Sequence, residues 1–293
     1  MEIKDLVGNT PLVKIDNVYL KLEYLNPTGS HKDRIALYML RDVENKGYAK
    51  GTPVIEYTSG NTGISVAWAS KFFGYKPVIF VPQGTSKEKV NMIRALGAET
   101  IIVPPEEDGH ILAEKLAEEI NGFYLEQTKN RANFRAHYET TGPELLSQAE
   151  DLDCFVMGAG TGGTIYGIGK YLKERNEKIK IVLLIPKGSE LQKELFDEVE
   201  EDAPILEGFS YHSFTELLKM AFDENIIDEI VVVDSEMSIK GVKALLSAGI
   251  PGGFTSGANY YHALKISKER DCKVATIVAD SIVRYSSLMD LIL

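Results

Sequence analysis

Short apolar segments alternate with amphipathic segments along most of this chain. In the first half, strands are expected at residues 18–23, 53–57, 77–81 and 100–103, and helices at 35–46, 62–73, 87–96, 109–121 and, with a break at 141–143, 130–149. In the second half, strands are expected at 153–157, 179–185, 229–233 and 273–278, and helices at 190–198, 214–222, 236–248, 258–268 and up to Lys173. A strand, a helix and a second strand in succession typically form a parallel βαβ unit. The sequence therefore predicts an α/β fold with mostly parallel sheets.

The chain has 293 residues and a formal charge of -11. That length suits one large domain or two smaller ones, and no linker cuts the chain, so we expect two interleaved lobes. The acidic balance argues against binding of nucleic acid or of an anionic membrane. No stretch resembles a signal peptide or a membrane span, and Cys154 and Cys272 fit no metal or disulfide pattern. We expect a cytoplasmic protein without a metal site.

A short loop, Asn26-Pro27-Thr28-Gly29-Ser30, joins the first expected strand to the first expected helix. Ser30 is a candidate N-cap, so Lys32 would lie in the first helical turn. The positive end of the helix dipole disfavours a charged lysine, and a neutral amine is what Schiff-base chemistry requires. Lys32 is therefore a candidate catalytic residue, although a lone lysine is more often a solvated surface residue.

A glycine-rich loop, Gly158-Ala159-Gly160-Thr161-Gly162-Gly163-Thr164, follows an expected strand and opens a helix. Its backbone amides and the helix dipole suit a phosphate group, and Thr161 and Thr164 add hydroxyl donors. The spacing also satisfies the dinucleotide fingerprint, which needs an acidic residue at the end of the next strand. That strand ends in Leu183-Leu184-Ile185-Pro186. The loop thus favours a phosphate over a dinucleotide, and close helix packing is the other explanation of its glycines.

Three further turns connect a strand to a helix or follow a strand. Thr58-Ser59-Gly60-Asn61-Thr62-Gly63 presents amides and hydroxyls that suit a carboxylate, although an ordinary capped helix start explains it equally well. Asp280-Ser281 follows the last expected strand, at the edge where α/β sheets bind ligands, and residues 252–259 form a second glycine-rich turn. For these last two, an ordinary turn is the simpler interpretation.

Together, and in this order, these loops resemble those of the cysteine synthase and cystathionine β-synthase family, the β-replacement branch of fold-type II pyridoxal-phosphate enzymes. The resemblance covers nearly the whole chain and includes Gly8-Asn9-Thr10-Pro11-Leu12, Leu96-Gly97-Ala98-Glu99, His137-Tyr138-Glu139-Thr140-Thr141-Gly142-Pro143-Glu144 and Ser256-Gly257-Ala258-Asn259. It implies a homodimer of two-lobed chains. Residues 1–37 and 138–293 would form the larger, cofactor-binding lobe, and residues 38–137 the smaller, mobile lobe.

The resemblance also implies a role for each matching residue. Lys32 would form the internal aldimine with pyridoxal phosphate and move protons at Cα and Cβ. The other positions are the phosphate-binding residues Gly160, Thr161, Gly162, Gly163 and Thr164, the ring-oxygen contact Asn61, the ring-nitrogen partner Ser281, and the carboxylate-binding residues Thr58, Ser59, Thr62 and Gln127. A serine at the ring nitrogen makes the ring a weak electron sink, which favours elimination followed by addition over transamination.

Two other interpretations of the same fold stay open. Dehydratases and racemases rank second, because they typically have a histidine after the asparagine and a run of glycines at the phosphate. A catalytically silent relative is the third interpretation, and the presence of Lys32 argues against it. Two departures leave the second substrate undecided. Pro204 and Leu206 stand where the family has glycines ahead of a Gly-Phe pair, and Thr128 replaces the aromatic residue that follows the pocket glutamine.

The choice of amino-acid donor depends on the distribution of arginines. A phosphoserine site should offer the phosphate a guanidinium, because the planar fork matches phosphate. No arginine lies between Asn176 and Glu269, although other cations could replace it, namely Lys187, Lys219, Lys240, Arg94 and Arg131. We therefore expect O-acetylserine and sulfide as substrates and L-cysteine as product. O-Phosphoserine, or free serine with homocysteine, are the alternatives.

Overall fold

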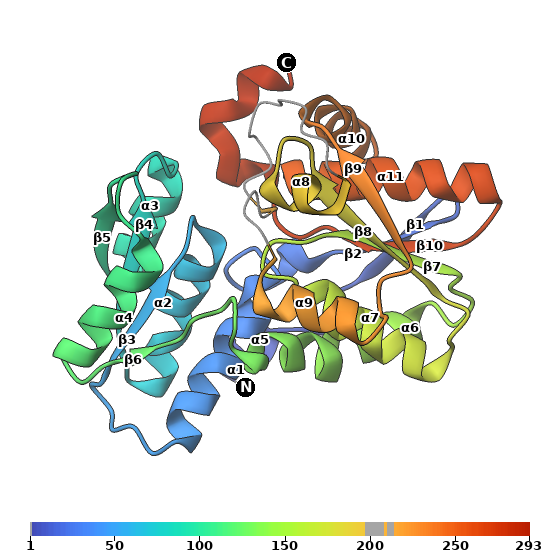
Figure 1. Cartoon of the computed structure of the whole chain (residues 1–293). Coiled ribbons are helices and arrows are strands. Elements are labelled where there is room, and N and C mark those ends of the chain that lie inside the picture. Colours follow the sequence, from blue (N-terminus) through green and yellow to red (C-terminus); the bar gives the residue numbers. More distant parts are fainter. Residues whose placement is uncertain (1, 197–207, 210–213) are drawn as a thin grey trace.

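The computed structural model describes residues 2–196, 208–209 and 214–293. Within them, two sheets flanked by helices form two lobes (Figure 1). The predicted α/β fold is confirmed. The lobe boundaries at 37/38 and 137/138 stay a prediction, and the first of them falls inside helix α1 (Lys32–Asn45), which runs along both lobes. The departures expected at Pro204 and Leu206 lie outside the described residues.

The larger sheet has six strands in the order β1-β2-β10-β7-β8-β9. Their bounds are β1 (Leu12–Ile15), β2 (Val18–Lys21), β7 (Cys154–Gly158), β8 (Lys180–Pro186), β9 (Glu229–Val233) and β10 (Val274–Ile277). Only the β1–β2 pair is antiparallel. Because β10 pairs with both β2 and β7, the last strand in sequence lies in the middle of the sheet. The residues after β10 therefore lie close to those after β2 and β7.

The smaller sheet has four strands in the order β5-β4-β3-β6, and all its pairs are parallel. The strands are β3 (Pro53–Tyr57), β4 (Lys76–Pro82), β5 (Glu99–Val103) and β6 (Phe123–Tyr124). In both sheets the central strands are buried on both faces, as parallel strands under helices usually are. Their carboxyl ends carry the loops that the sequence singled out.

Helices cover both sheets. The α-helices after α1 are α2 (Asn61–Phe73), α3 (Lys87–Ala95), α4 (Gly109–Glu119), α5 (Arg131–Ala136), α6 (Gly142–Gln148), α7 (Gly163–Arg175), α8 (Glu190–Phe196), α9 (Glu216–Asp223), α10 (Ser235–Ser247) and α11 (Phe254–Arg270). Short 3-10 segments are η1 (Ile3–Leu6), η2 (Glu23–Leu25) and η4 (Ile282–Leu291), and η3 (His137–Thr141) is a π-helical turn. None of the helices in the described part of the chain could cross a bilayer.

Four local expectations differ from the structure. Helix α1 begins three residues earlier than expected, and α11 begins four residues earlier. The expected break at 141–143 is not a break, because η3 connects α5 to α6 without leaving the helical path. Strand β6 and segment η4 were not expected, since two residues are too few for an alternation and η4 has no clear apolar period.

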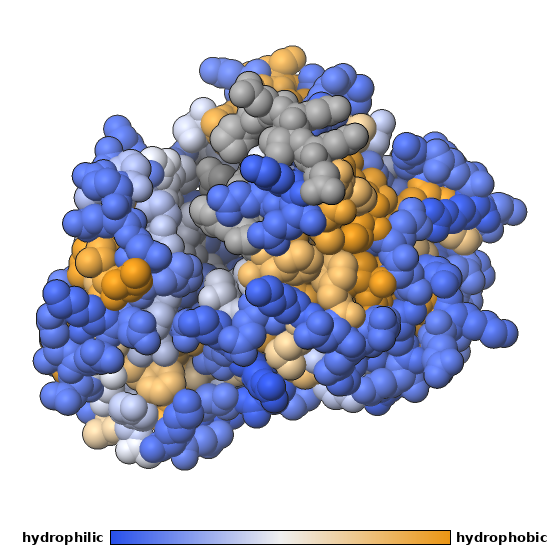
Figure 2. All heavy atoms as spheres, in the orientation of Figure 1, coloured by the Kyte–Doolittle hydropathy of each residue, from blue (hydrophilic) through white to orange (hydrophobic). Residues whose placement is uncertain are grey.

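The edge strand β9 is less covered than the central strands, and four of its five residues are partly exposed. Figure 2 shows apolar surface in this part of the larger lobe, next to α9. The partly buried side chains packed there include Met220, Phe222, Ile227, Ile230 and Val232. The other visible surface of both lobes is mostly hydrophilic.

Candidate active site

Loops that follow β3, β7 and β10 line a cavity of about 400 Å³ together with residues of both lobes. Ten of the twelve site residues expected from the sequence lie in its wall, namely Lys32, Thr58, Ser59, Asn61, Thr62, Gln127, Gly160, Thr161, Gly162 and Thr164. The position at the carboxyl ends of parallel strands is where α/β proteins usually bind their ligands. The remaining two residues, Gly163 and Ser281, are not part of the wall.

Lys32 is the first residue of α1, and its side chain is partly exposed in the cavity. The hydroxyl of Ser30 accepts the Lys32 backbone N–H at 3.3 Å, so this serine does serve the helix start, although the N-cap position is His31. Burial lowers the pKa of Lys32 to about 8, against the opposing effect of Asp280 and Glu56. A lysine with this pKa is partly neutral near neutral pH, which suits a nucleophilic amine.

The carboxylate-type loop begins α2, and its neighbours hold it in shape. Thr58 Oγ1 accepts the backbone N–H of Gly60 at 3.2 Å, and Thr62 Oγ1 donates to Gln127 Oε1 at 2.7 Å. The buried carboxyl of Glu56 accepts the backbone N–H of Gln127 at 3.2 Å. Burial raises the pKa of Glu56 to about 8. Thr62 and Gln127, which are 65 positions apart, are thus brought together at one side of the cavity.

The phosphate-type loop begins α7, whose positive end faces the cavity. Gly162 has a φ of 80°, and a Cβ there would lie 2.8 Å from backbone atoms of Leu218. A Cβ on Gly160 would lie 2.8 Å from the Gly208 carbonyl oxygen. The loop therefore needs glycine at both positions. It presents backbone amides and the hydroxyls of Thr161 and Thr164, which is the donor set that suits a phosphate.

Gly163 lies behind the wall rather than in it. A Cβ at this position would lie 2.3 Å from Asn133 Oδ1, which has no hydrogen-bond partner among the described residues. Asn133 Nδ2 donates to Thr161 Oγ1 at 2.9 Å. Gly163 thus lets α7 approach α5 closely, so that Asn133 can hold the Thr161 side chain at the cavity.

The structure places Asp280, not Ser281, in the cavity wall. Asp280 is buried, and its Oδ2 accepts hydrogen bonds from Asn61 Nδ2 and Tyr285 Oη, both at 2.7 Å. The Ser281 hydroxyl instead accepts the N–H of Val283 and caps η4. Ser281 has an extended backbone, in which successive side chains point to opposite sides. For this reason only one residue of the Asp280-Ser281 pair can face the cavity.

Several wall residues were not expected from the sequence. They include His31, Lys89, His110, Phe209, Thr255 and Tyr285. Thr255 lies in the glycine-rich turn at 252–259, so that turn was a usable signal. Lys89 and His110 belong to helices α3 and α4 of the smaller lobe, and no local pattern marks them. The ammonium of Lys89 lies 4.4 Å from the centre of the Tyr285 ring.

Two buried histidines lie beside Lys32 and the phosphate-type loop. Burial, and then the charge of Lys32, lowers the pKa of His31 to about 3. Burial also holds the pKa of His137 well below its ordinary value. His137 Nε2 lies 3.2 Å from Thr164 Oγ1, and its Nδ1 lies 2.9 Å from Thr141 Oγ1. Both imidazoles are therefore neutral near pH 7 and contribute hydrogen bonding rather than charge.

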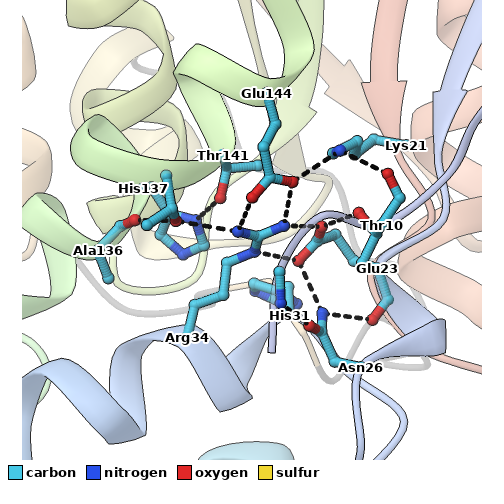
Figure 3. Close-up of polar contacts among 12 residues, drawn as sticks. Thr10, Lys21, Glu23, Asn26, His31, Arg34, Ala136, His137, Thr141 and Glu144 are labelled. Atoms are coloured by element: carbon cyan, nitrogen blue, oxygen red, sulfur yellow. Dashed lines mark hydrogen bonds and ion pairs between the residues drawn. The ribbon is translucent and has the colours of Figure 1, made fainter. Parts of the chain in front are cut away.

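A buried ion cluster holds α1 from the side opposite the cavity (Figure 3). The Arg34 guanidinium lies between the carboxylates of Glu23 and Glu144, with nitrogen to oxygen distances of 2.7 to 2.8 Å. Lys21 Nζ lies 2.8 Å from Glu144 Oε2 and donates to the Thr10 carbonyl at 2.7 Å. The cluster joins α1 to β2, η2 and α6, and thereby fixes the helix that begins with Lys32.

Comparison with known proteins agrees with this site. The family model described as "Pyridoxal-phosphate dependent enzyme" matches residues 3–280. The chain belongs to this family. Its cofactor is accordingly pyridoxal phosphate, and the glycine cradle, the hydroxyls and the amine described above fit the phosphate and the aldehyde of that cofactor.

Among its relatives, the chain is 39% identical to a cystathionine β-synthase of Apis mellifera, over 97% of this chain and 60% of that protein. It therefore spans about three fifths of the length of that relative. It is 37% identical to a cysteine synthase of Staphylococcus aureus (strain N315), over 97% of this chain and 95% of that protein. A crystal structure of an O-acetylserine dependent cystathionine β-synthase from Helicobacter pylori superposes with a TM-score of 0.89, at 32% identity, over 98% of this chain and 97% of that one.

Proposed function

We propose that this pyridoxal-phosphate enzyme catalyses β-replacement on O-acetylserine with sulfide, giving L-cysteine and acetate. In this reaction the Cβ–O bond to acetate breaks, a Cβ–S bond forms, and sulfide loses a proton. The observation that carries the choice of donor is the composition of the cavity wall. Its described residues include Lys32 and Lys89 but no arginine. Arg94 and Arg131, the candidate guanidinium donors of the smaller lobe, are exposed and lie outside the wall.

Bound pyridoxal phosphate supplies the electron sink next to the substrate Cα. The residues of the chain do the rest. The Lys32 amine takes the proton from Cα, holds it while acetate leaves, and returns it after sulfide adds. Its pKa of about 8 lets it both accept and release a proton near neutral pH.

The two loops divide the binding between them. In this proposal the donors of Gly160–Thr164 hold the cofactor phosphate, and Asn61 contacts the ring oxygen. Thr58, Ser59, Thr62 and Gln127 bind the substrate carboxylate, and the hydrogen bond from Thr62 to Gln127 keeps the two sides of this carboxylate site together. The ring-nitrogen position falls to the polar groups that line the wall there, Thr255 and Asp280, rather than to Ser281.

A donor comparison tests the proposed substrate. The purified protein is loaded with pyridoxal phosphate, and kcat/KM is measured for O-acetylserine, O-phosphoserine and serine at one sulfide concentration. We expect the highest value for O-acetylserine, because an acetyl leaving group needs no cationic partner. Each tenfold difference corresponds to about 1.4 kcal/mol of transition-state binding.

Two outcomes would change the proposal. A clear preference for O-phosphoserine would show that Lys89 serves as the phosphate partner in place of an arginine. Pyruvate release from serine, without cysteine formation when sulfide is present, would instead support a dehydratase. Parallel assays with homocysteine in place of sulfide show whether the same site also makes cystathionine.

A further inference from the structure

The amide of Asn61 is held from both sides by charged groups of the larger lobe. Arg284 Nη1 donates a hydrogen bond to Asn61 Oδ1 at 2.7 Å, and Asn61 Nδ2 donates to Asp280 Oδ2, also at 2.7 Å. A guanidinium can only donate and an ionised carboxylate can only accept. These two partners therefore decide which end of the amide is the oxygen, a choice that often stays open for asparagine.

The second hydrogen of Asn61 Nδ2 has no acceptor among the described residues. Asn61 is the first residue of α2 and lies in the cavity wall. With Oδ1 turned to Arg284 and one N–H turned to Asp280, the group that the amide has left to offer a ligand is an N–H donor. Such a donor suits an oxygen atom that carries negative charge.

Arg284 is itself anchored to the loop in front of Lys32. Its Nη2 donates to the carbonyl of Thr28. A Cβ on Gly29 would lie 3.2 Å from the same nitrogen, so the glycine lets the guanidinium lie flat against this loop. Asp33, on the first turn of α1, in turn accepts the Thr28 backbone N–H at 2.7 Å. Arg284 thus connects η4, the loop before α1 and the start of α2.

We propose that Arg284 is a positioning residue, which with Asp280 orients the Asn61 amide so that Nδ2 donates to the ring oxygen of bound pyridoxal phosphate. The inference rests on the placement of that ring oxygen at Asn61, which belongs to the proposed function. Without Arg284, Oδ1 loses its donor, and only Asp280 restrains the amide. The N–H then meets the ring oxygen less often, which weakens cofactor binding and changes the visible absorption of the bound cofactor.

A double-mutant cycle between Arg284 and Asn61 tests this role. Pyridoxal phosphate is titrated into the apoprotein, and its Kd is read from the visible absorption band. We expect Arg284→Met to raise Kd roughly tenfold when Asn61 is present, the size of one lost hydrogen bond to a charged group. In the Asn61→Ala background the same change should raise Kd by less than about twofold. Equal factors in both backgrounds would overturn the proposal, because Arg284 would then act on the fold through Thr28.

Two further variants keep the test clear. Arg284→Lys retains a cation at Thr28 but not the planar fork that reaches both partners, so its Kd should lie between those of wild type and Arg284→Met. This variant replaces Arg284→Met if the latter does not fold. Arg270→Met removes an exposed arginine that pairs with Glu229 and should leave Kd unchanged. A wild-type protein that binds no pyridoxal phosphate would overturn the proposed function as well, whereas equal factors in a cofactor-binding protein overturn only the role of Arg284.

Discussion

Lys32 and Arg34 lie two positions apart on helix α1, but they face opposite sides of it and have different surroundings. Arg34 is 2% exposed, and carboxylates of two other elements accept its hydrogen bonds. Burial alone would lower its pKa, but Glu23 and Glu144 raise it. Lys32 opens into the cavity, and burial lowers its pKa to about 8 although Asp280 and Glu56 act against this. One cation is therefore permanent and structural, and the other can lose its proton.

The difference shows how a rigid cluster and a reactive group can share one helix. The carboxylates around Arg34 compensate its charge completely, so this side of α1 gains stability and specificity from the pair but no reactivity. Around Lys32 the compensation is weaker than the cost of burial, which is what makes the amine available for chemistry. Changes on the two sides should therefore affect different observables.

The largest expected effect is on activity. Lys32→Ala should lower kcat by roughly 10²–10⁴-fold, the usual contribution of a positioned acid or base. The free energy of unfolding should not fall, because a buried ammonium is removed without leaving a carboxylate that depended on it. Steady-state kinetics and chemical denaturation measure the two quantities. A variant with nearly full activity would move the proton-transfer role to another residue.

Arg34→Met should reverse this pattern and lower stability most. Removing Arg34 leaves Glu23 buried without its partner, and breaking a buried ion pair typically costs about 3–5 kcal/mol. Arg135→Met is the matched control, since Arg135 pairs with Asp42 on the surface and such pairs contribute at most about 1 kcal/mol. Urea denaturation of both variants makes the comparison. Equal, small losses would show that the cluster does not stabilise α1.

The two sides should also differ in their response to pH. A lysine must be neutral to react, so the rate of covalent cofactor uptake should rise about tenfold per unit up to pH 8 and then level off, since the pKa of Lys32 is about 8. Burial alone would raise the pKa of Glu23, but Arg34 lowers it to about 2. Stability from this carboxylate is therefore present above pH 4.5 and is lost only as the pH falls toward 2.

Stopped-flow absorbance after mixing apoprotein with pyridoxal phosphate gives the first profile, and acid denaturation gives the second. An uptake rate that still climbs tenfold per unit at pH 10 would place the pKa of Lys32 at its ordinary value. Loss of stability already between pH 6 and 5 would show that Glu23 is not held ionised by Arg34.

The smallest expected effects concern the ring end of the cavity. Thr255→Val removes a hydroxyl from the wall at nearly constant volume and should lower kcat/KM roughly tenfold. Ser281→Ala should change kcat/KM by less than about twofold, because its hydroxyl caps η4 and does not reach the cavity. A larger loss in Ser281→Ala than in Thr255→Val would restore Ser281 as the ring partner.

Features that depend on local residue patterns could be predicted from the sequence. The alternation of segments placed β3 and β9 at their observed bounds, and the loops at 58–62 and 160–164 meet at one cavity because both follow carboxyl ends of parallel strands. The choice between Asp280 and Ser281 depends on which way an extended backbone turns, and the residue pattern carries no signal for that. Lys89 and His110 reach the cavity from the outside of the smaller sheet. The partners of Arg34 lie 11 and 110 positions away, so only the fold could bring them together.

The most direct test of the account asks which lysine carries the cofactor. The protein is incubated with pyridoxal phosphate, reduced with borohydride, digested, and mapped by mass spectrometry. We predict a single modified peptide, labelled at Lys32, and loss of the label in Lys32→Ala. Label at Lys89 or at any other lysine, or no label in a protein that shows the visible cofactor band, would contradict the assignment of Lys32 as the reactive amine.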